Sequence, residues 1–220
     1  MTWTRTRDRR LARAGCALLA ALATAVAAAP AADAQTRTST PTGNSSLAAL
    51  LAQDGAGFDR NPNDFDIADN AVQAVLKAKP SSAVAVLADG KVPLTAFLPT
   101  DRAFRRLAGD LTGRHYRGEE RVFTALATKL GVDTIESVLL YHVVPGATLT
   151  YRQALNADGA TLTTALKGST IKVDVVRCAR VKLIDADKDD ANPYVVKRNL
   201  NRGNVQIAHG INRVLRPVNL

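Results

Sequence analysis

The sequence predicts an α+β domain, with helices in its first part and strands in its last third. Apolar residues first recur at helical spacing, whereas Ile171, Val173 and Val175 alternate with polar residues, as is typical of a half-buried strand. Helices that precede a mostly antiparallel sheet define the α+β class, and no internal repeat indicates another architecture. We therefore expect one domain over residues 64–217.

The first 34 residues have the pattern of a secretory signal peptide. Five arginines precede a run from Cys16 to Ala29 without a charged side chain, and Ala32 and Ala34 supply the small residues of a cleavage site. This run of about fourteen residues is too short to span a bilayer. We expect export, by the general rather than the twin-arginine route, and no stable membrane span after cleavage. An uncleaved anchor is the alternative.

Cleavage after Ala34 changes the cysteine count and the charge. It removes Cys16 and leaves Cys178, so no intramolecular disulfide can form. It also removes five arginines and two aspartates, which lowers the formal net charge from +9 to +6. A basic surface favours acidic partners such as anionic glycans or wall polymers, with a merely solvated positive surface as the alternative. Nucleic acid is not expected, because the protein is exported and lacks interleaved exposed aromatic residues.

The elements follow in order. Residues 35–46 (QTRTSTPTGNSS) lack apolar side chains apart from a proline, which predicts a flexible tether. A short helix is expected to follow, and residues 35–63 thus precede the domain. A helix over residues 64–78 buries one apolar face and is closed by Pro80. Residues 94–98 predict a buried strand, after which Thr100 is placed to cap a helix that ends at Gly109.

A further helix is expected to end at Gly131. Asp133 and Glu136 have the spacing of a capping box before the helix that contains residues 138–140. The C-terminal strands are predicted around residues 171–175, 181–183, 195–196 and 205–207. Gly210 lies within the last of these apolar segments, where a glycine weakens a strand or marks a bulge.

Three apolar segments have the order and spacing of a known family. Residues 95–104 (TAFLPTDRAF) match the pattern Thr-x-Phe-x-Pro-Thr-x-x-Ala-Phe in full, and residues 138–146 (VLLYHVVPG) contain a Tyr-His pair. Residues 205–217 (VQIAHGINRVLRP) fit the closing strand at His209 and Ile211 but depart from it elsewhere. The chain thus resembles the fasciclin (FAS1) domain.

The resemblance implies a wedge-shaped β-sandwich with flanking helices, and a role in extracellular adhesion or matrix binding. It also implies a partner-binding site, which matches Tyr141 and His142 here. For His142 itself, however, we expect a buried imidazole that is hydrogen-bonded to the backbone or to a side-chain hydroxyl group, with a direct partner contact as the alternative. Tyr141 has the same two interpretations, and His209, in an apolar strand, is expected to be a core residue.

Charged clusters supply the other candidates. The acidic stretch at residues 185–190 lacks the glycine and the bidentate glutamate of an EF-hand, so a solvated loop is expected there and no metal site. Arginines at residues 102–121 form one basic group, and a second group near the C-terminus supplies the candidates for binding a polyanion: Arg198, Arg202, Arg213 and Arg216. Scattered, solvated arginines are the alternative.

We expect a secreted, monomeric binding module that acts outside the cell or at its surface. Its partner would be an extracellular protein or glycan, and electrostatic binding of an anionic glycan or wall polymer is the alternative. The sequence contains no nucleophile elbow, zinc-protease motif, phosphate-binding glycine loop or Cys-x-x-Cys, so no catalysis and no cofactor are expected. A small-ligand carrier or a cryptic hydrolase stays open as a weaker hypothesis.

Overall fold

A computed structural model describes residues 41–55, 57–177 and 179–220. They belong to a compact unit, Ser39–Leu220, and the predicted signal peptide, the first part of the tether and Cys178 lie outside the described residues. None of the helices in the described part combines the length and the apolar character that crossing a membrane requires.

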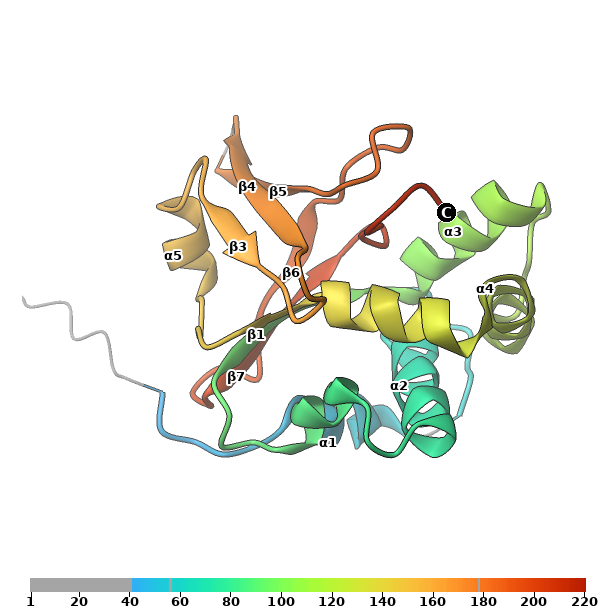
Figure 1. The fold of residues 1–220 in the computed structure, drawn as a ribbon, viewed down its shortest axis with the longest axis horizontal. Coiled ribbons are helices and arrows are strands. Elements are labelled where there is room, and N and C mark those ends of the chain that lie inside the picture. Colours follow the sequence, from blue (N-terminus) through green and yellow to red (C-terminus); the bar gives the residue numbers. More distant parts are fainter. Residues whose placement is uncertain (1–40, 56, 178) are drawn as a thin grey trace, which may run out of the picture. The chain divides into compact units, whose positions relative to one another are not determined.

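Two β-sheets form the C-terminal half and the centre of the domain (Figure 1). The first has the strand order β2-β1-β7-β6, in which β1 and β7 are parallel and the other pairs antiparallel. The second, antiparallel throughout, has the order β3-β4-β5. The strands are β1 (Leu94–Pro99), β2 (Val143–Pro145), β3 (Thr161–Thr163), β4 (Thr170–Val176), β5 (Arg180–Ile184), β6 (Val195–Leu200) and β7 (Gln206–Ile211).

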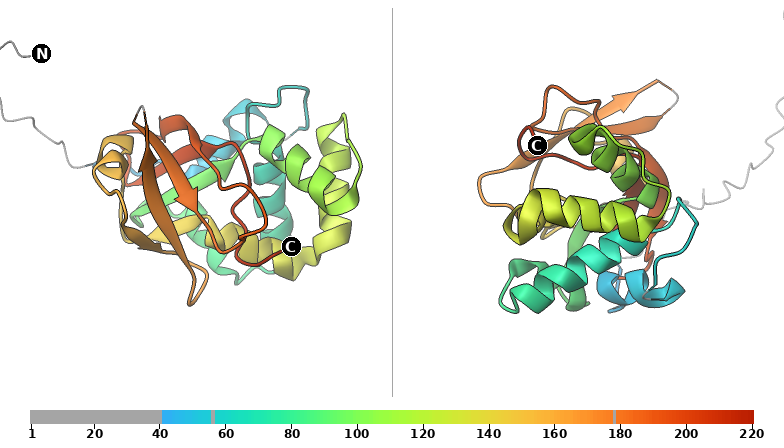
Figure 2. Two further views of the ribbon diagram at one scale, coloured as in Figure 1. Left: turned by 90° about the horizontal axis from the view of Figure 1, so that it is seen from above. Right: turned by 90° about the vertical axis from the view of Figure 1, so that its right-hand side faces the viewer.

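The longer helices gather at one end of the domain, and Figure 2 shows α5 beside the three-stranded sheet at the other end. Helix α4 contains a break at Gly131, whose φ of 74° lies in the left-handed region, so the predicted stop at this glycine is a kink between two helical segments. The helices are α1 (Leu47–Leu51), α2 (Asp66–Ala78), α3 (Asp101–Thr112), α4 (Glu119–Tyr141) and α5 (Tyr151–Leu155), with 3₁₀ turns η1 (Ala52–Asp54) and η2 (Ala83–Ala88).

Strand β1 lies at the centre of the core, and all six of its residues are buried. Its side chains alternate between two apolar clusters, as the period of a strand requires. Phe97 packs with Tyr141 and Ile171 between the two sheets. Leu94 packs with Val75 on the side of the helices. This double burial explains why the strand appears in the sequence as a continuous apolar run. The predicted α+β class is confirmed.

Three local predictions were wrong, and at the two predicted helix starts more distant segments supply the hydrogen bonds. Thr100 occupies the N-cap position of α3, but its side chain makes no capping bond there. The helix continues through Gly109 to Thr112, and Gly113, whose φ of 67° lies in the left-handed region, is its C-cap. Instead of forming a local capping box, the Glu136 carboxylate accepts hydrogen bonds from Lys79 and Ser82.

The segment before α1 packs on the rest of the domain. Gly43 forms a bridge with Asn204, and the Leu47 amide donates to the buried Gln206 side chain at 2.8 Å. Leu47 is fully buried. Thus the predicted short helix contributes to the core, although the sequence predicts a domain that begins only at residue 64.

Gly210 has a steric role. An added Cβ atom would lie 2.8 Å from the Cβ atom of Lys197 on β6 and 3.2 Å from Phe65. The pairing of β6 with β7 shifts register around Lys197, so the predicted irregularity is in the partner strand opposite this glycine.

Candidate functional site

The Tyr-His pair lies where α4 ends and β2 begins, in the interior of the domain. Tyr141 is the last residue of α4 and is fully buried. Its hydroxyl group donates a hydrogen bond to the carbonyl oxygen of Thr170 at 2.9 Å, which ties α4 to the second sheet. Burial, with a smaller contribution from Asp185, raises the pKa of Tyr141 to about 12.

His142 uses both of its ring nitrogens within the domain. Nδ1 lies 2.7 Å from the carbonyl oxygen of Val138, and Nε2 accepts a hydrogen bond from the backbone N–H of Leu215 at 2.9 Å. This pattern defines one neutral tautomer, with the proton on Nδ1. Burial lowers the pKa of His142 to about 4. The buried, backbone-bonded imidazole that the sequence predicts as one interpretation is what the structure contains.

These contacts join three parts of the chain. Besides its side-chain bonds to α4 and to the C-terminal segment, His142 accepts a backbone hydrogen bond from Phe97 of β1 at 2.9 Å. A partner would reach the imidazole only after the segment around Leu215 had moved. The site that the resemblance implies at Tyr141 and His142 is therefore enclosed by the domain itself.

We expect His142 to stay neutral in the folded protein between pH 7.5 and 5. Since its folded pKa is about 4, against 6.5 for a free histidine, its contribution to stability is complete above about pH 6.5 and is lost as the pH falls toward 4. The loss at pH 4 is on the order of 3 kcal/mol. An NMR titration of the His142 ring protons checks this, and a midpoint near 6.5 in the folded protein would contradict it.

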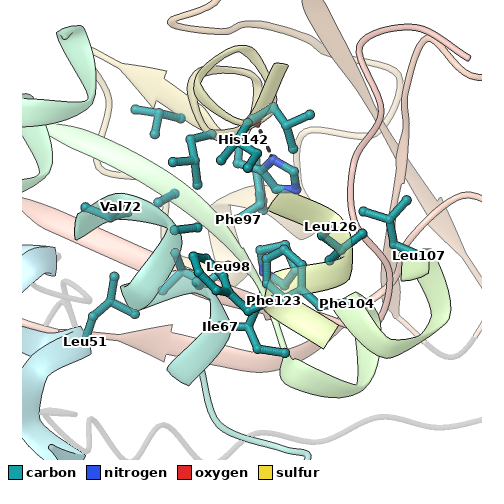
Figure 3. A pocket seen from close by; sticks show the side chains of 18 of the residues that line it. Leu51, Ile67, Val72, Phe97, Leu98, Phe104, Leu107, Phe123, Leu126 and His142 are labelled. Carbon is teal, nitrogen blue, oxygen red and sulfur yellow. Dashed lines mark hydrogen bonds between the residues drawn. The ribbon is translucent and has the colours of Figure 1, made fainter. Parts of the chain in front are cut away.

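An apolar cavity of about 50 Å³ lies beside His142 (Figure 3). Residues of α2, β1 and α4 line it, and the His142 ring lies next to Phe97 above Leu98, Phe104 and Phe123. Because both imidazole nitrogens are already hydrogen-bonded, the ring contributes no free polar atom to this space. Such a cavity stays dry and can take up at most a very small apolar molecule.

The histidines do not converge on one site in the described domain. His209 on β7 is buried. Its Nε2 lies 2.8 Å from the carbonyl oxygen of Leu149, and its Nδ1 accepts a hydrogen bond from the backbone N–H of Asn199 at 3.3 Å. Burial lowers its pKa. It is a core residue, as the sequence predicts. His115 is exposed in the loop after α3.

Two of the four predicted polyanion-binding arginines are engaged in ion pairs. The Arg216 guanidinium contacts Asp187 at 3.4 Å, Asp190 at 3.0 Å and Asp110 at 2.7 Å, and Arg213 contacts Asp190 at 2.9 Å. Arg216 is only 7% exposed and Asp187 only 3%. The prediction of a solvated acidic loop at residues 185–190 was therefore wrong, because these carboxylates hold the C-terminal segment.

The other two arginines lie elsewhere. The Arg198 guanidinium lies 4.1 Å from the centre of the Tyr151 ring, a cation–π geometry, and Arg202 is exposed in the turn between β6 and β7. The four candidates thus divide between an internal ion-pair cluster and separate positions on the strands. They do not supply four free guanidinium groups to one polyanion.

A basic surface that was not predicted from the sequence lies on the second sheet. Lys172 of β4 and Arg180 and Lys182 of β5 alternate with buried residues and so share its outer face. The Arg180 guanidinium lies 4.3 Å from the centre of the Tyr194 ring, and Lys182 pairs with Asp174 at 2.5 Å. The alternating pattern indicates the outward positions, but the strand pairing that brings them together requires the fold.

The fold and its interior define an α+β module whose Tyr-His motif is a structural element. The fasciclin domain model matches residues 69–217, and the chain belongs to the fasciclin domain family. FAS1 domains are adhesion modules, generally non-catalytic and typically extracellular.

A solved structure shows the same fold. The FAS1 domain pair of the insect cell adhesion molecule fasciclin I matches with a TM-score of 0.52 and 16% sequence identity. The match covers 78% of this chain and 51% of that one, so the chain corresponds to about half of the matched structure. Among curated proteins, none matches this sequence.

Proposed function

We propose that the protein is an exported, monomeric adhesion module that binds an extracellular protein or glycan without catalysing a reaction. The observation that carries this proposal is the fasciclin match over residues 69–217, because the family consists of such modules. The interior supports it further, since the buried histidines are saturated by backbone hydrogen bonds and have no catalytic partners among the described residues.

A second candidate, binding of an anionic glycan or wall polymer, is favoured by the outer face of the β3-β4-β5 sheet. Three cations lie there, together with one carboxylate at Asp174. The ring of Tyr194, held under Arg180, adds a flat apolar surface of the kind on which a sugar ring can pack. Lys172, Arg180 and Lys182 are the residues that would contact the polymer.

The first experiment is binding of the purified protein to immobilised cell-envelope and matrix components at about 50 mM and about 500 mM NaCl, since exposed charges are screened at high salt. For anionic-polymer binding, we expect affinity to fall at least about tenfold at high salt. The variant Lys172→Ala/Arg180→Ala/Lys182→Ala should show a similar loss at low salt. The control Arg114→Ala/Arg117→Ala/Arg121→Ala removes the same charge from exposed positions after α3 and at the start of α4.

The outcomes separate the two candidates. Binding that survives high salt and both variants indicates a specific packed interface, as the adhesion proposal requires. Binding that is lost at high salt and in the sheet variant alone indicates polymer binding by the outer face. Equal losses in both variants would mean that affinity depends on the net charge of the protein, which would contradict a site on the outer face. No binding at either salt concentration would contradict the adhesion proposal.

A further inference from the structure

Three carboxylates from three separate segments meet under the helices. Asp64 precedes α2, Asp101 begins α3 and Glu119 begins α4. One oxygen of each lies within 4.8 Å of the others, and all three residues are buried. Asp59, which is exposed, and Asp66 form an overlapping group of the same kind through Asp64. Asp59 is therefore the one exposed member of these two overlapping groups.

The carboxylates differ in how well the domain satisfies them. Asp101 Oδ1 accepts a hydrogen bond from the Ile67 amide at 2.9 Å, at the N-terminus of α2. Glu119 accepts from the Asp59 amide at 2.9 Å and from Arg105 at 2.7 Å. In contrast, Asp64 Oδ1 is buried and has no hydrogen-bond partner within the described part of the chain, although the residue is only 7% exposed. Burying a polar atom without a partner is costly, so Asp64 Oδ1 indicates a missing ligand.

The charges point to the kind of ligand. When all three carboxylates are ionised, they and the Arg105 guanidinium carry a formal charge of −2 together, which one divalent cation would neutralise. Asp59 and Asp66 add further negative charge beside Asp64. A set made only of carboxylate oxygens selects a hard cation over zinc or copper, which favour nitrogen and sulfur ligands.

We propose that this cluster is a calcium-binding site, with Asp64, Asp101 and Glu119 as ligands and Asp59 and Asp66 at its entrance. Calcium suits the cluster better than magnesium, because Mg²⁺ usually keeps several waters and uses one or two carboxylates, whereas Ca²⁺ accepts several carboxylates in flexible geometry. Bound calcium would tie the start of α3 and the start of α4 to the segment before α2, and would stabilise the helical end of the domain.

A shared proton is the alternative counter-ion. Burial, with a contribution from the neighbouring Asp64 carboxyl group, raises the pKa of Asp101 to about 8, so at neutral pH one proton can be shared by these two carboxyl groups. A proton and a divalent cation have different consequences, since only the cation makes the melting temperature depend on calcium concentration.

The experiment measures the melting temperature of the chelator-treated full chain at pH 7.5, with CaCl₂, MgCl₂ or NaCl at matched ionic strength, and measures calcium binding by isothermal titration calorimetry. We expect CaCl₂ to raise Tm by several degrees, with about one ion bound per chain, and MgCl₂ to have a smaller effect. The absence of a heat of calcium binding, or a Tm shift that NaCl reproduces, would overturn the proposal in favour of the shared proton.

Variants locate the site. Asp64→Asn should weaken calcium binding at least tenfold, and should leave Tm without calcium unchanged or higher because repulsion is relieved. Glu120→Gln, at the exposed neighbour of Glu119, and Asp189→Asn, in the acidic loop, should bind calcium as the wild type does. If Asp64→Asn does not fold, the exposed Asp59→Asn serves in its place, with an expected loss of a few-fold. Unchanged binding in the folded cluster variants, or loss in Asp189→Asn, would overturn the assignment.

Discussion

Replacing Arg216 by methionine is expected to lower the free energy of unfolding by about 3 kcal/mol, because it leaves a buried carboxylate without its cation. Asp187 is 3% exposed and forms an ion pair with Arg216, whereas Asp190 keeps its ion pair with Arg213. A domain of this size should show a fall in Tm of roughly 6–12 °C, measured by thermal and denaturant unfolding.

Two further variants test the cause of this loss. Arg202→Met removes the same charge from an exposed turn and should change the unfolding free energy by less than about 0.5 kcal/mol. Adding Asp187→Asn to Arg216→Met removes the uncompensated charge and should recover part of the lost stability. If adding Asp187→Asn instead lowers the unfolding free energy further, the unpaired carboxylate is not the cause. Lost packing of the arginine side chain then explains the effect.

Replacing His142 by alanine is expected to cost about 3 kcal/mol of unfolding free energy. The change leaves the Leu215 N–H without its acceptor in a buried position, and it enlarges the apolar cavity beside the ring. Any specific binding, measured per folded molecule, should weaken less than stability does, because the imidazole is enclosed. Denaturant unfolding and a binding assay on the same preparation check both parts.

The control is His115→Ala, at an exposed position after α3, which should change stability by no more than about 0.5 kcal/mol. An unchanged melting temperature of His142→Ala together with lost binding would contradict the structural role. It would instead indicate that a partner reaches the imidazole in a state in which the C-terminal segment has moved.

Patterns that depend on neighbours in the sequence were predicted well. The continuous apolar run at β1 and the alternation at β4 and β5 indicate strands, because strand burial follows a period of two. The predictions of local helix capping were wrong where groups that are distant in the sequence supply or accept the hydrogen bonds. The Glu136 carboxylate bonds to Lys79 and Ser82, and Thr100 makes no side-chain capping bond while Asp101 reaches the start of α2.

The candidate sites show the same division more sharply. The Tyr-His motif is visible in the sequence, but burial of His142 depends on Leu215, which is 73 residues away. Equally, nothing within residues 185–190 reveals that Asp187 and Asp190 face Arg216. Nothing within residues 59–64 reveals that Asp64 faces Asp101 and Glu119. Such contacts carry no periodic signal.

By itself, the sequence determined the α+β class and the resemblance to the fasciclin domain, because these depend on apolar periodicity and on motifs whose residues are close together. Only the tertiary structure decided which charged and polar groups are free. Arg213 and Arg216 form ion pairs with aspartates, and Lys172, Arg180 and Lys182 share one outer face. Asp64 Oδ1 has no hydrogen-bond partner within the described part of the chain. The physical reason is that the energy of a charge depends on burial and on partners a few ångströms away, which chain folding brings together from distant segments.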